Sequence, residues 1–128
     1  PELRRNLADE LMRPHRAYYR QLKSLLPLLK GIAHITGGGL IDNLPRVLPA
    51  GLTAHLQRRP WEEPPIFRMI AERGKVTEKE MFHVFNMGVG MVLICSPGDS
   101  RQLLKELKEA KVIGEVVKQE AKERVIID

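Results

Sequence analysis

The sequence predicts an α+β fold in which helices cover a mixed β-sheet, and two kinds of pattern support this class. Short runs rich in Val, Ile and Leu, such as residues 88–95, are typical of buried strands. Elsewhere apolar residues recur every three or four positions. This spacing is typical of amphipathic helices, as in residues 77–85, where Thr77 begins a Thr-x-x-Glu capping box. The two patterns follow one another in mixed order, with no internal repeat.

The composition describes one globular domain over residues 1–128, in which residues 1–15 form an entry helix and linker. Of the 128 residues, 43% are hydrophobic and 29% are charged, which suffices for one core and excludes a disordered chain or a multidomain enzyme. The longest nearly apolar stretch, residues 88–95, is far shorter than the ~20 residues of a membrane span. Because the chain opens Pro-Glu-Leu-Arg-Arg, without Met or an apolar signal region, we expect a processed end or a piece of a longer polypeptide.

The N-terminal part is predicted to combine short helices with one strand. Leu3, Leu7 and Leu11 form the stripe of an amphipathic helix over residues 3–12, and Pro14 ends it. We then expect an extended segment over 16–23, a short apolar helix over 24–29, a strand over 31–35 and one or two helical turns over 40–44.

The rest of the chain is predicted to alternate strands with amphipathic helices. We expect a strand over 52–57, a proline-rich loop over 59–65, a helix that ends at Gly74, and a helix from Thr77 that buries Met81, Phe82 and Phe85. Residues 88–95 are predicted to form a buried central strand, and residues 97–99 a turn before a helix that starts near Ser100. Two strands, over 112–118 and 124–127, complete the order.

The charge pattern does not favour nucleic acid. The 21 Lys and Arg residues exceed the 16 Asp and Glu residues by five, and the excess lies mainly near the N-terminus. Such a balance suits nucleic acid, a small anionic ligand or an ordinary solvated surface. Three Phe, two Tyr and one Trp are too few and too scattered for a base-stacking platform, so we expect no nucleic-acid partner.

Metal and thiol chemistry are not expected in this chain. His15, His34, His55 and His83 are widely spaced, with no Cys or carboxylate at ligand spacing, so no metal site is predicted. The single cysteine, Cys95, ends an apolar run and is interpreted as a buried neutral thiol, because a reactive thiolate would need a cationic neighbour. One unpaired cysteine indicates a reducing, cytoplasmic compartment.

The most informative segment is Gly-Ile-Ala-His-Ile-Thr-Gly-Gly-Gly, residues 31–39. Each glycine costs about 1 kcal/mol relative to Ala in regular structure, so three in succession need a reason. One reason is a tight turn with positive φ. The other is a loop whose bare amides contact a phosphate, with His34 and Thr36 as added donors. The spacing fits neither a Walker A loop nor the Rossmann fingerprint, so this loop could not hold a nucleotide and magnesium unaided.

A second glycine-bearing segment, Phe-Asn-Met-Gly-Val-Gly-Met, covers residues 85–91. Its glycines permit close strand packing. Asn86 is the exception, because its side-chain amide can orient a loop or a ligand at a strand edge.

These residues together resemble a known enzyme family. The run His-Ile-Thr-Gly-Gly-Gly-Leu-Ile-Asp-Asn-Leu-Pro-Arg-Val-Leu-Pro, residues 34–49, is followed by Trp61, by Pro-Pro-Ile-Phe at 64–67 and by residues 81–91. This pattern resembles the C-terminal domain of phosphoribosylformylglycinamidine cyclo-ligase, also called aminoimidazole ribonucleotide synthetase, from about residue 11 to residue 128. The family usually has Pro-Thr-x-Ile/Leu-Tyr where this chain has Pro-His-Arg-Ala-Tyr at 14–18, and Asp42 stands where Glu is common. The stretch between Lys30 and Gly31 also looks shortened.

The resemblance implies an α+β domain of that type and a role in purine biosynthesis. In the family, ATP phosphorylates the amide oxygen of formylglycinamidine ribonucleotide, and the amidine nitrogen then closes the imidazole ring and expels phosphate. ATP and Mg are bound mainly by an N-terminal domain that this chain lacks, so the resemblance implies that the isolated chain is inactive. It also implies two partners beyond the small molecules, namely the chain's own N-terminal domain and a second copy in a full-length homodimer.

The resemblance further assigns site residues. His34 is the catalytic candidate, and Thr36, Gly37, Gly38 and Gly39 are expected to contact phosphate groups. Asp42, Asn43 and Arg46 are expected to support them, although Arg46 is also interpretable as a plain surface cation. Alternative functions are a phosphate-compound binding or interaction module and a related enzyme: formylglycinamidine ribonucleotide synthetase, selenophosphate synthetase or thiamine-monophosphate kinase. The sequence Asn-Leu-Pro-Arg-Val-Leu-Pro at 43–49 disfavours these related enzymes.

Overall fold

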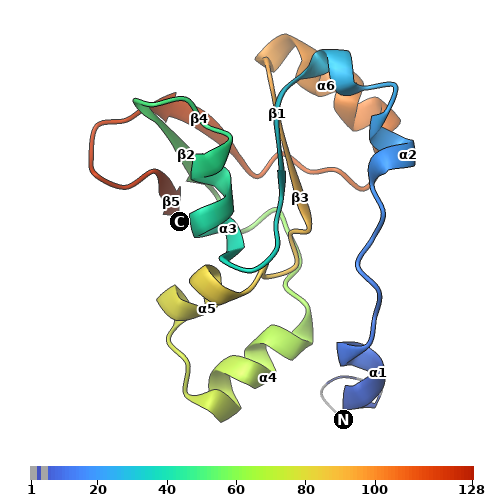
Figure 1. The fold of residues 1–128 in the computed structure, drawn as a ribbon, viewed down its shortest axis with the longest axis vertical. Coiled ribbons are helices and arrows are strands. Elements are labelled where there is room, and N and C mark those ends of the chain that lie inside the picture. The colour runs from blue at the N-terminus through green and yellow to red at the C-terminus, as the bar shows by residue number, and fades with distance from the viewer. Residues whose placement is uncertain (1–2, 4–5) are drawn as a thin grey trace.

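Two small sheets carry the fold. A computed structural model describes residue 3 and residues 6–128. Strand β1 (Leu29–His34) pairs antiparallel with β3 (Met91–Cys95). Strand β2 (Leu52–Leu56) lies between β4 (Gly114–Lys118), which is antiparallel to it, and β5 (Val125–Ile127), which is parallel (Figure 1). The predicted α+β class is confirmed, and the mixed sheet is the three-stranded one.

The helices are short and lie around the two sheets. They are α1 (Leu7–Leu11), α2 (Tyr19–Leu22), the 3-10 helix η1 (Leu26–Leu28), α3 (Gly39–Asn43), the 3-10 helix η2 (Leu44–Arg46), α4 (Pro65–Gly74), α5 (Glu78–Val84) and α6 (Pro97–Glu106). In Figure 1, α4 and α5 lie at the end of the β1–β3 ladder opposite to α6. None of the helices that the structure describes is long and apolar enough to cross a membrane.

Local sequence signals explain several helix ends. Pro65 occupies the first turn of α4, where a missing amide costs nothing, and the helix ends at Gly74 as predicted. The Thr77 side chain accepts a hydrogen bond from the Glu80 amide at 3.3 Å, which confirms the predicted cap of α5. Met81 and Phe82 are buried as expected.

Three predicted elements were placed wrongly. Residues 16–23 are not extended, because α2 forms there and Leu22 anchors it in the core. Pro14 restricts only the residue before it, so it does not prevent a helix five residues later. Of the helix predicted over residues 3–12, the structure has Leu7–Leu11, which begins after Asn6, whose side chain accepts from the Ala8 amide. Residues 4 and 5 of that range lie outside the described residues. Helix α6 begins at Pro97, three residues before Ser100, because proline is suited to a first helical turn.

The prediction of a buried central strand over 88–95 is also wrong. The strand covers only the last five of these residues, has β1 as its one partner, and fully buries Val92 alone. Gly88, at φ +94°, belongs to the turn before it. An apolar run predicts that a strand is buried but not how many strands pair with it. The sequence therefore could not distinguish a central strand from one in a two-stranded ladder. The partner strand begins at Leu29, earlier than the predicted residue 31, and a register shift follows Leu29.

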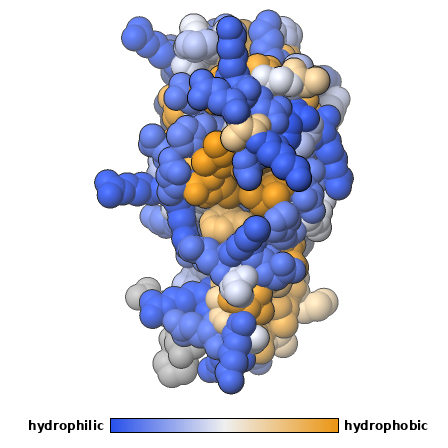
Figure 2. Space-filling model, turned by 90° about the vertical axis from the view of Figure 1, so that its left-hand side faces the viewer, coloured by the Kyte–Doolittle hydropathy of each residue, from blue (hydrophilic) through white to orange (hydrophobic). Residues whose placement is uncertain are grey.

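The core lies where α3 and α5 meet the two sheets. Its most completely buried side chains are Ile35, Leu40, Leu44 and Met81, each exposed by at most 1%. Not all apolar surface is covered, however. Figure 2 shows apolar side chains gathered in the middle of the face that lies on the left of Figure 1. Exposed apolar residues of the elements α5, β4 and β5 are Val84, Val116 and Ile126.

The contrast between buried and exposed leucines gives a stability test. Leu40→Ala should lower the free energy of unfolding by about 3 kcal/mol, because it removes a fully buried side chain and leaves a cavity. Leu11→Ala, at a side chain that is 63% exposed, should change it by less than about 0.5 kcal/mol. Urea unfolding followed by circular dichroism measures both. Equal effects would contradict this description of the core.

Candidate functional site

The glycine loop, residues 36–39, follows β1 directly and is held at both ends. The Ile35 amide donates to the Gly90 carbonyl at 3.0 Å, which fixes the loop's start to the segment before β3. The Gly39 amide donates to the Thr36 carbonyl at 3.1 Å and closes the turn. Along the loop, Gly37 is exposed and Gly39 is buried. The loop therefore leaves the sheet at the surface and returns to the core within three residues.

The three glycines serve different purposes. Gly38 and Gly39 have φ of +96° and +57°, a region that residues with a Cβ adopt at a cost. A Cβ on Gly39 would lie 2.1 Å from the Phe82 carbonyl oxygen, so α3 and α5 pack too closely for a side chain. The tight-turn interpretation therefore explains these two glycines. Gly37 has open space around the position of a Cβ, and the turn does not require a glycine there.

Asn43 holds the loop in its shape. Its buried side-chain Nδ2 lies 2.7 Å from the Gly39 carbonyl oxygen, 3.2 Å from that of Gly37 and 3.5 Å from that of Thr36. In a planar trans peptide the carbonyl and the following amide point in opposite directions. Because the carbonyls of Thr36 and Gly37 face Asn43, the amides of Gly37 and Gly38 face away from it. Within residues 6–128 these two amides donate no backbone hydrogen bond.

A hollow of about 280 Å³ lies beside the loop. Thr36 and Gly37 form part of one wall, and the end of α5 and a residue of α4 form another. The lining residues are His15, Ile35, Thr36, Gly37, Phe67, Val84, Phe85 and Asn86. The rings of Phe67 and Phe85, with centroids 5.7 Å apart, give the hollow an apolar side. Backbone of the glycine loop and aromatic rings thus line the same hollow, a combination of polar and apolar groups that is typical of small-molecule sites.

Asn86 shapes the turn that borders this hollow. Its Oδ1 accepts a hydrogen bond from the Gly88 amide at 3.0 Å, and between them Met87 has φ +50°, an uncommon value for a residue with a side chain. Asn86 thus orients its own loop, one of the two roles that the sequence allowed. Asn86 is also one of the residues that line the hollow.

The structure brings together two histidines that the sequence kept apart. His34 ends β1, and its Nε2 lies 3.4 Å from Nδ1 of His15, which belongs to the entry segment. The two rings meet edge to face with centroids 4.5 Å apart. Sequence spacing gave no signal of this pair, because it depends on where the segment between α1 and α2 passes beside the ladder (Figure 1).

The remaining predicted site residues lie outside the lining of this hollow. Asp42, with a half-exposed side chain, faces His83, whose Nδ1 is 3.6 Å from its Oδ1. Arg46 is exposed on η2. The structure thus gathers Thr36, Gly37 and Asn43 with His34 beside them. Asp42 also adjoins the loop, because its amide donates to the Gly38 carbonyl at 3.1 Å, whereas Arg46 lies farther along on η2.

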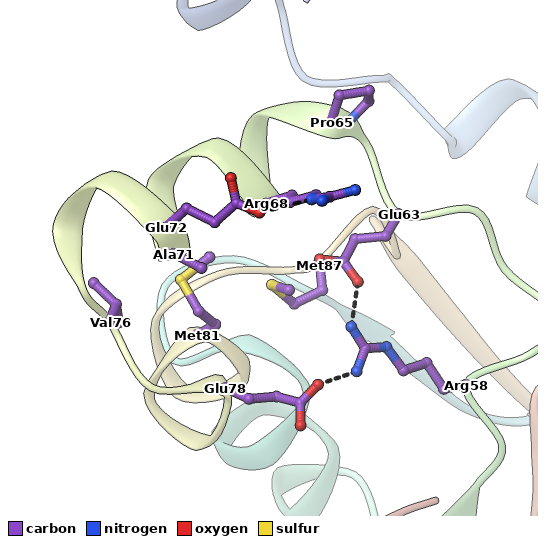
Figure 3. Close-up of a pocket in the computed structure, with 10 residues that line it drawn as sticks. All are labelled: Arg58, Glu63, Pro65, Arg68, Ala71, Glu72, Val76, Glu78, Met81 and Met87. Atoms are coloured by element: carbon purple, nitrogen blue, oxygen red, sulfur yellow. Dashed lines mark hydrogen bonds and ion pairs between the residues drawn. The ribbon is translucent and has the colours of Figure 1, made fainter. Parts of the chain in front are cut away.

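A larger hollow, of about 670 Å³, lies between α4, α5 and the loop before α4 (Figure 3). Arg58 bridges two carboxylates there, Glu63 at 2.7 Å and Glu78, and its guanidinium lies over the Phe82 ring. The hydrogen bond to Glu63 is the largest cause of a raised Arg58 pKa, with Glu78 adding to it. Two carboxylates share the one guanidinium of Arg58, so this cluster keeps a net negative charge, and no predicted site residue lines this hollow. Its ion pairs clamp the loop onto α5.

Two further expectations from the sequence concern metal binding and the thiol of Cys95. Residues 3 and 6–128 contain no group of three or more His, Cys, Asp or Glu that could hold a metal ion. Burial raises the pKa of the Cys95 thiol, and nearby Asp99 raises it further. The raised pKa agrees with a neutral thiol, but the expectation that Cys95 is buried is wrong, because its side chain is only partly buried.

A matched pair of substitutions tests the different roles of the glycines. Gly39→Ala should destabilise the fold by about 3 kcal/mol or more, because φ is positive and the Cβ would collide with a backbone oxygen. Gly37→Ala should change stability by less than about 0.5 kcal/mol. Thermal unfolding of both variants measures the difference. A stable Gly39→Ala protein would contradict the packing of α3 on α5.

Comparison with known proteins agrees with this arrangement. A family model described as "AIR synthase related protein, C-terminal domain" matches residues 2–127. A phosphoribosylformylglycinamidine cyclo-ligase from a Thermoanaerobacter species is 44% identical over 125 residues, which cover 94% of this chain and 37% of the relative. One from Caldicellulosiruptor bescii is 49% identical over 113 residues, covering 87% and 33%. One from Burkholderia mallei is 47% identical over 108 residues, covering 83% and 31%.

The match covers nearly all of this chain, while the chain spans about a third of the length of these relatives. The resemblance seen in residues 34–49 and 81–91 thus extends over both sheets and the helices between them. This chain belongs to the AIR synthase related protein C-terminal domain family.

Proposed function

We propose that this chain is the C-terminal part of an ATP-dependent cyclo-ligase of purine biosynthesis. Its reaction closes the imidazole ring of formylglycinamidine ribonucleotide to give aminoimidazole ribonucleotide. The observation that carries the proposal is the outward-facing amide pair of Gly37 and Gly38, in a chain 44% identical to a protein named for this reaction. The proposal assigns to this chain a part in the reaction for which the relative is named, and it adds roles for individual residues.

The glycine loop would contact phosphate groups. A backbone amide without an internal partner is a strong donor, and two adjacent ones can hold one anion. The amides of Gly37 and Gly38 and the hydroxyl of Thr36 would supply these donors. Gly39 and Asn43 would shape the loop. Phosphoryl transfer and ring closure both depend on positioning, which a loop fixed by buried contacts provides.

The other predicted residues would act at the rim. His34, the catalytic candidate from the sequence, adjoins the loop and would belong to the reaction site, and Asp42 and Arg46 would support the loop from α3 and η2. Asp42 already faces a histidine, His83, so its carboxylate would help to orient this side of the cleft.

ATP and Mg would bind mainly to the N-terminal domain of the complete protein. When bound there, they would supply the phosphoryl group that activates the substrate's amide oxygen. The described residues would contribute phosphate donors at the glycine loop. The chain alone would therefore be inactive. We also propose a cytoplasmic location and a homodimer for the complete protein.

The entry helix would pack against that N-terminal domain. Leu7, Leu11 and Met12 are 45%, 63% and 81% exposed, and Tyr19 is 68% exposed. Leu7 and Leu11 have the spacing of a buried helix face, yet α1 buries none of its residues, and Tyr19 lies on the separate helix α2. This chain spans 37% of the length of the Thermoanaerobacter relative. We propose that the N-terminal domain of the complete protein covers these exposed side chains.

The test joins this chain to its N-terminal domain and measures ATP-dependent ring closure. Gly38→Val should lower kcat/KM by about 100-fold, because φ is +96° and the new Cβ would lie 2.8 Å from the Asp42 Cβ. His34→Ala should also lower the rate. His55→Ala is the matched control, because His55 pairs with Asp128 on the three-stranded sheet.

Two outcomes would reject parts of this proposal. Unchanged rates in both Gly38→Val and His34→Ala would reject the site assignment. A complete wild-type protein that binds phosphate esters but closes no ring would favour the alternative, a phosphate-compound binding module.

A further inference from the structure

We propose that His15, a residue of the entry segment, is the proton acceptor in ring closure, with His34 as its positioning residue. The inference rests on the proposed function and names the group at that site that takes the proton. His15 lies where the family usually has Thr, so the family pattern does not supply the assignment.

Position favours His15 over His34. His15 lines the hollow that Thr36 and Gly37 also line, and His34 is not among its lining residues. Of the two histidines, His15 is therefore the one whose ring borders the hollow beside the glycine loop. Asn86 also lines this hollow, but a side-chain amide cannot accept a proton at neutral pH.

The hydrogen bonds decide which nitrogen of His15 is free. Its Nδ1 lies 3.3 Å from the Arg16 carbonyl oxygen, and a carbonyl can only accept, so Nδ1 carries the hydrogen. The same Nδ1–H is within 3.4 Å of the His34 Nε2, which must then act as an acceptor. In neutral His15 the bare nitrogen is consequently Nε2. Because Nδ1 is committed in this way, the pair is poorly suited to chelating a metal ion.

The contacts of the entry segment fix the position of the His15 ring. As an imidazolium, His15 would keep Nδ1–H directed at two acceptors, the Arg16 carbonyl and the His34 ring. The entry segment itself is fixed, because Arg16 pairs with Glu109 and its guanidinium lies over the Tyr18 ring. The Tyr18 hydroxyl occupies the space that a side chain on Gly90 would need. These contacts hold the ring at the hollow.

The step balances without another reactant. The bond from the amidine nitrogen to the activated carbon forms as the bond from that carbon to the phosphate oxygen breaks, and inorganic phosphate leaves with its electron pair. The proton on the attacking nitrogen passes to His15 Nε2 and then to water. General base catalysis of this kind typically contributes 10²- to 10⁴-fold to a rate.

Steady-state kinetics of the complete protein test the role. His15→Ala and His15→Gln should each lower kcat by about 100-fold while KM changes by less than about twofold. Added imidazole should restore the rate of His15→Ala by on the order of tenfold, and should leave His15→Gln, whose side chain fills the space, largely unrescued. His55→Ala should match the wild type with and without imidazole.

Three results would overturn the inference. They are a normal kcat in His15→Ala, a loss confined to KM, and a rate that imidazole does not raise. If the wild-type complete protein closes no ring, the proposed function fails first. A wild type that is active beside an equally active His15→Ala protein rejects the inference alone.

The tautomer can be measured in the 128-residue chain without any activity. Long-range ¹H–¹⁵N spectra should show neutral His15 protonated at Nδ1 and bare at Nε2. His34→Ala should remove one acceptor and loosen the His15 ring, seen as broadening or averaging of its signals. A His15 ring protonated at Nε2 in the wild type would contradict the assignment.

Discussion

The contact between the buried amide of Asn43 and the carbonyls of the glycine loop is the constraint on which the site depends. The amide gathers the oxygens of Thr36, Gly37 and Gly39 on one side, with Gly39 closest at 2.7 Å. Peptide planarity then turns the Gly37 and Gly38 amides to the other side. A buried donor group that serves several carbonyls is costly to remove, because each of those carbonyls would lose a hydrogen bond. The anion-binding character proposed for the loop thus comes from one side chain behind it.

The constraint works only because the rest of the fold supports it. Gly39 allows α3 to approach the end of α5 closely, and that approach buries Asn43. The entry segment then brings a second imidazole to the same place, where β1 alone would offer only His34. The larger hollow near Arg58 has more volume, but its charges are already paired. Unsatisfied donors, rather than hollow size, indicate where an anionic ligand would bind.

Several helix ends and the glycine loop could be predicted from the sequence, because the residues that determine them are close together in the chain. The capping box at Thr77, the proline at the start of α4 and the glycines after β1 each report a backbone requirement of their own neighbourhood. The errors concern tertiary partners. Residues 88–95 did not reveal that their strand has a single neighbour, and residues 16–23 did not reveal that Leu22 would anchor a helix. The proximity of His15 and His34 likewise depends on where the entry segment passes beside β1, which the spacing of residues in the sequence does not predict.

A phosphate titration of the ¹⁵N-labelled chain and of an Asn43→Leu variant tests the central claim most directly. The account predicts that the Gly37 and Gly38 amide signals of the wild type shift selectively with inorganic phosphate. In Asn43→Leu these shifts should disappear, and the free energy of unfolding should fall by about 1–3 kcal/mol because buried carbonyls lose their donor. A folded variant whose Gly37 and Gly38 amides still respond as in the wild type would contradict the account.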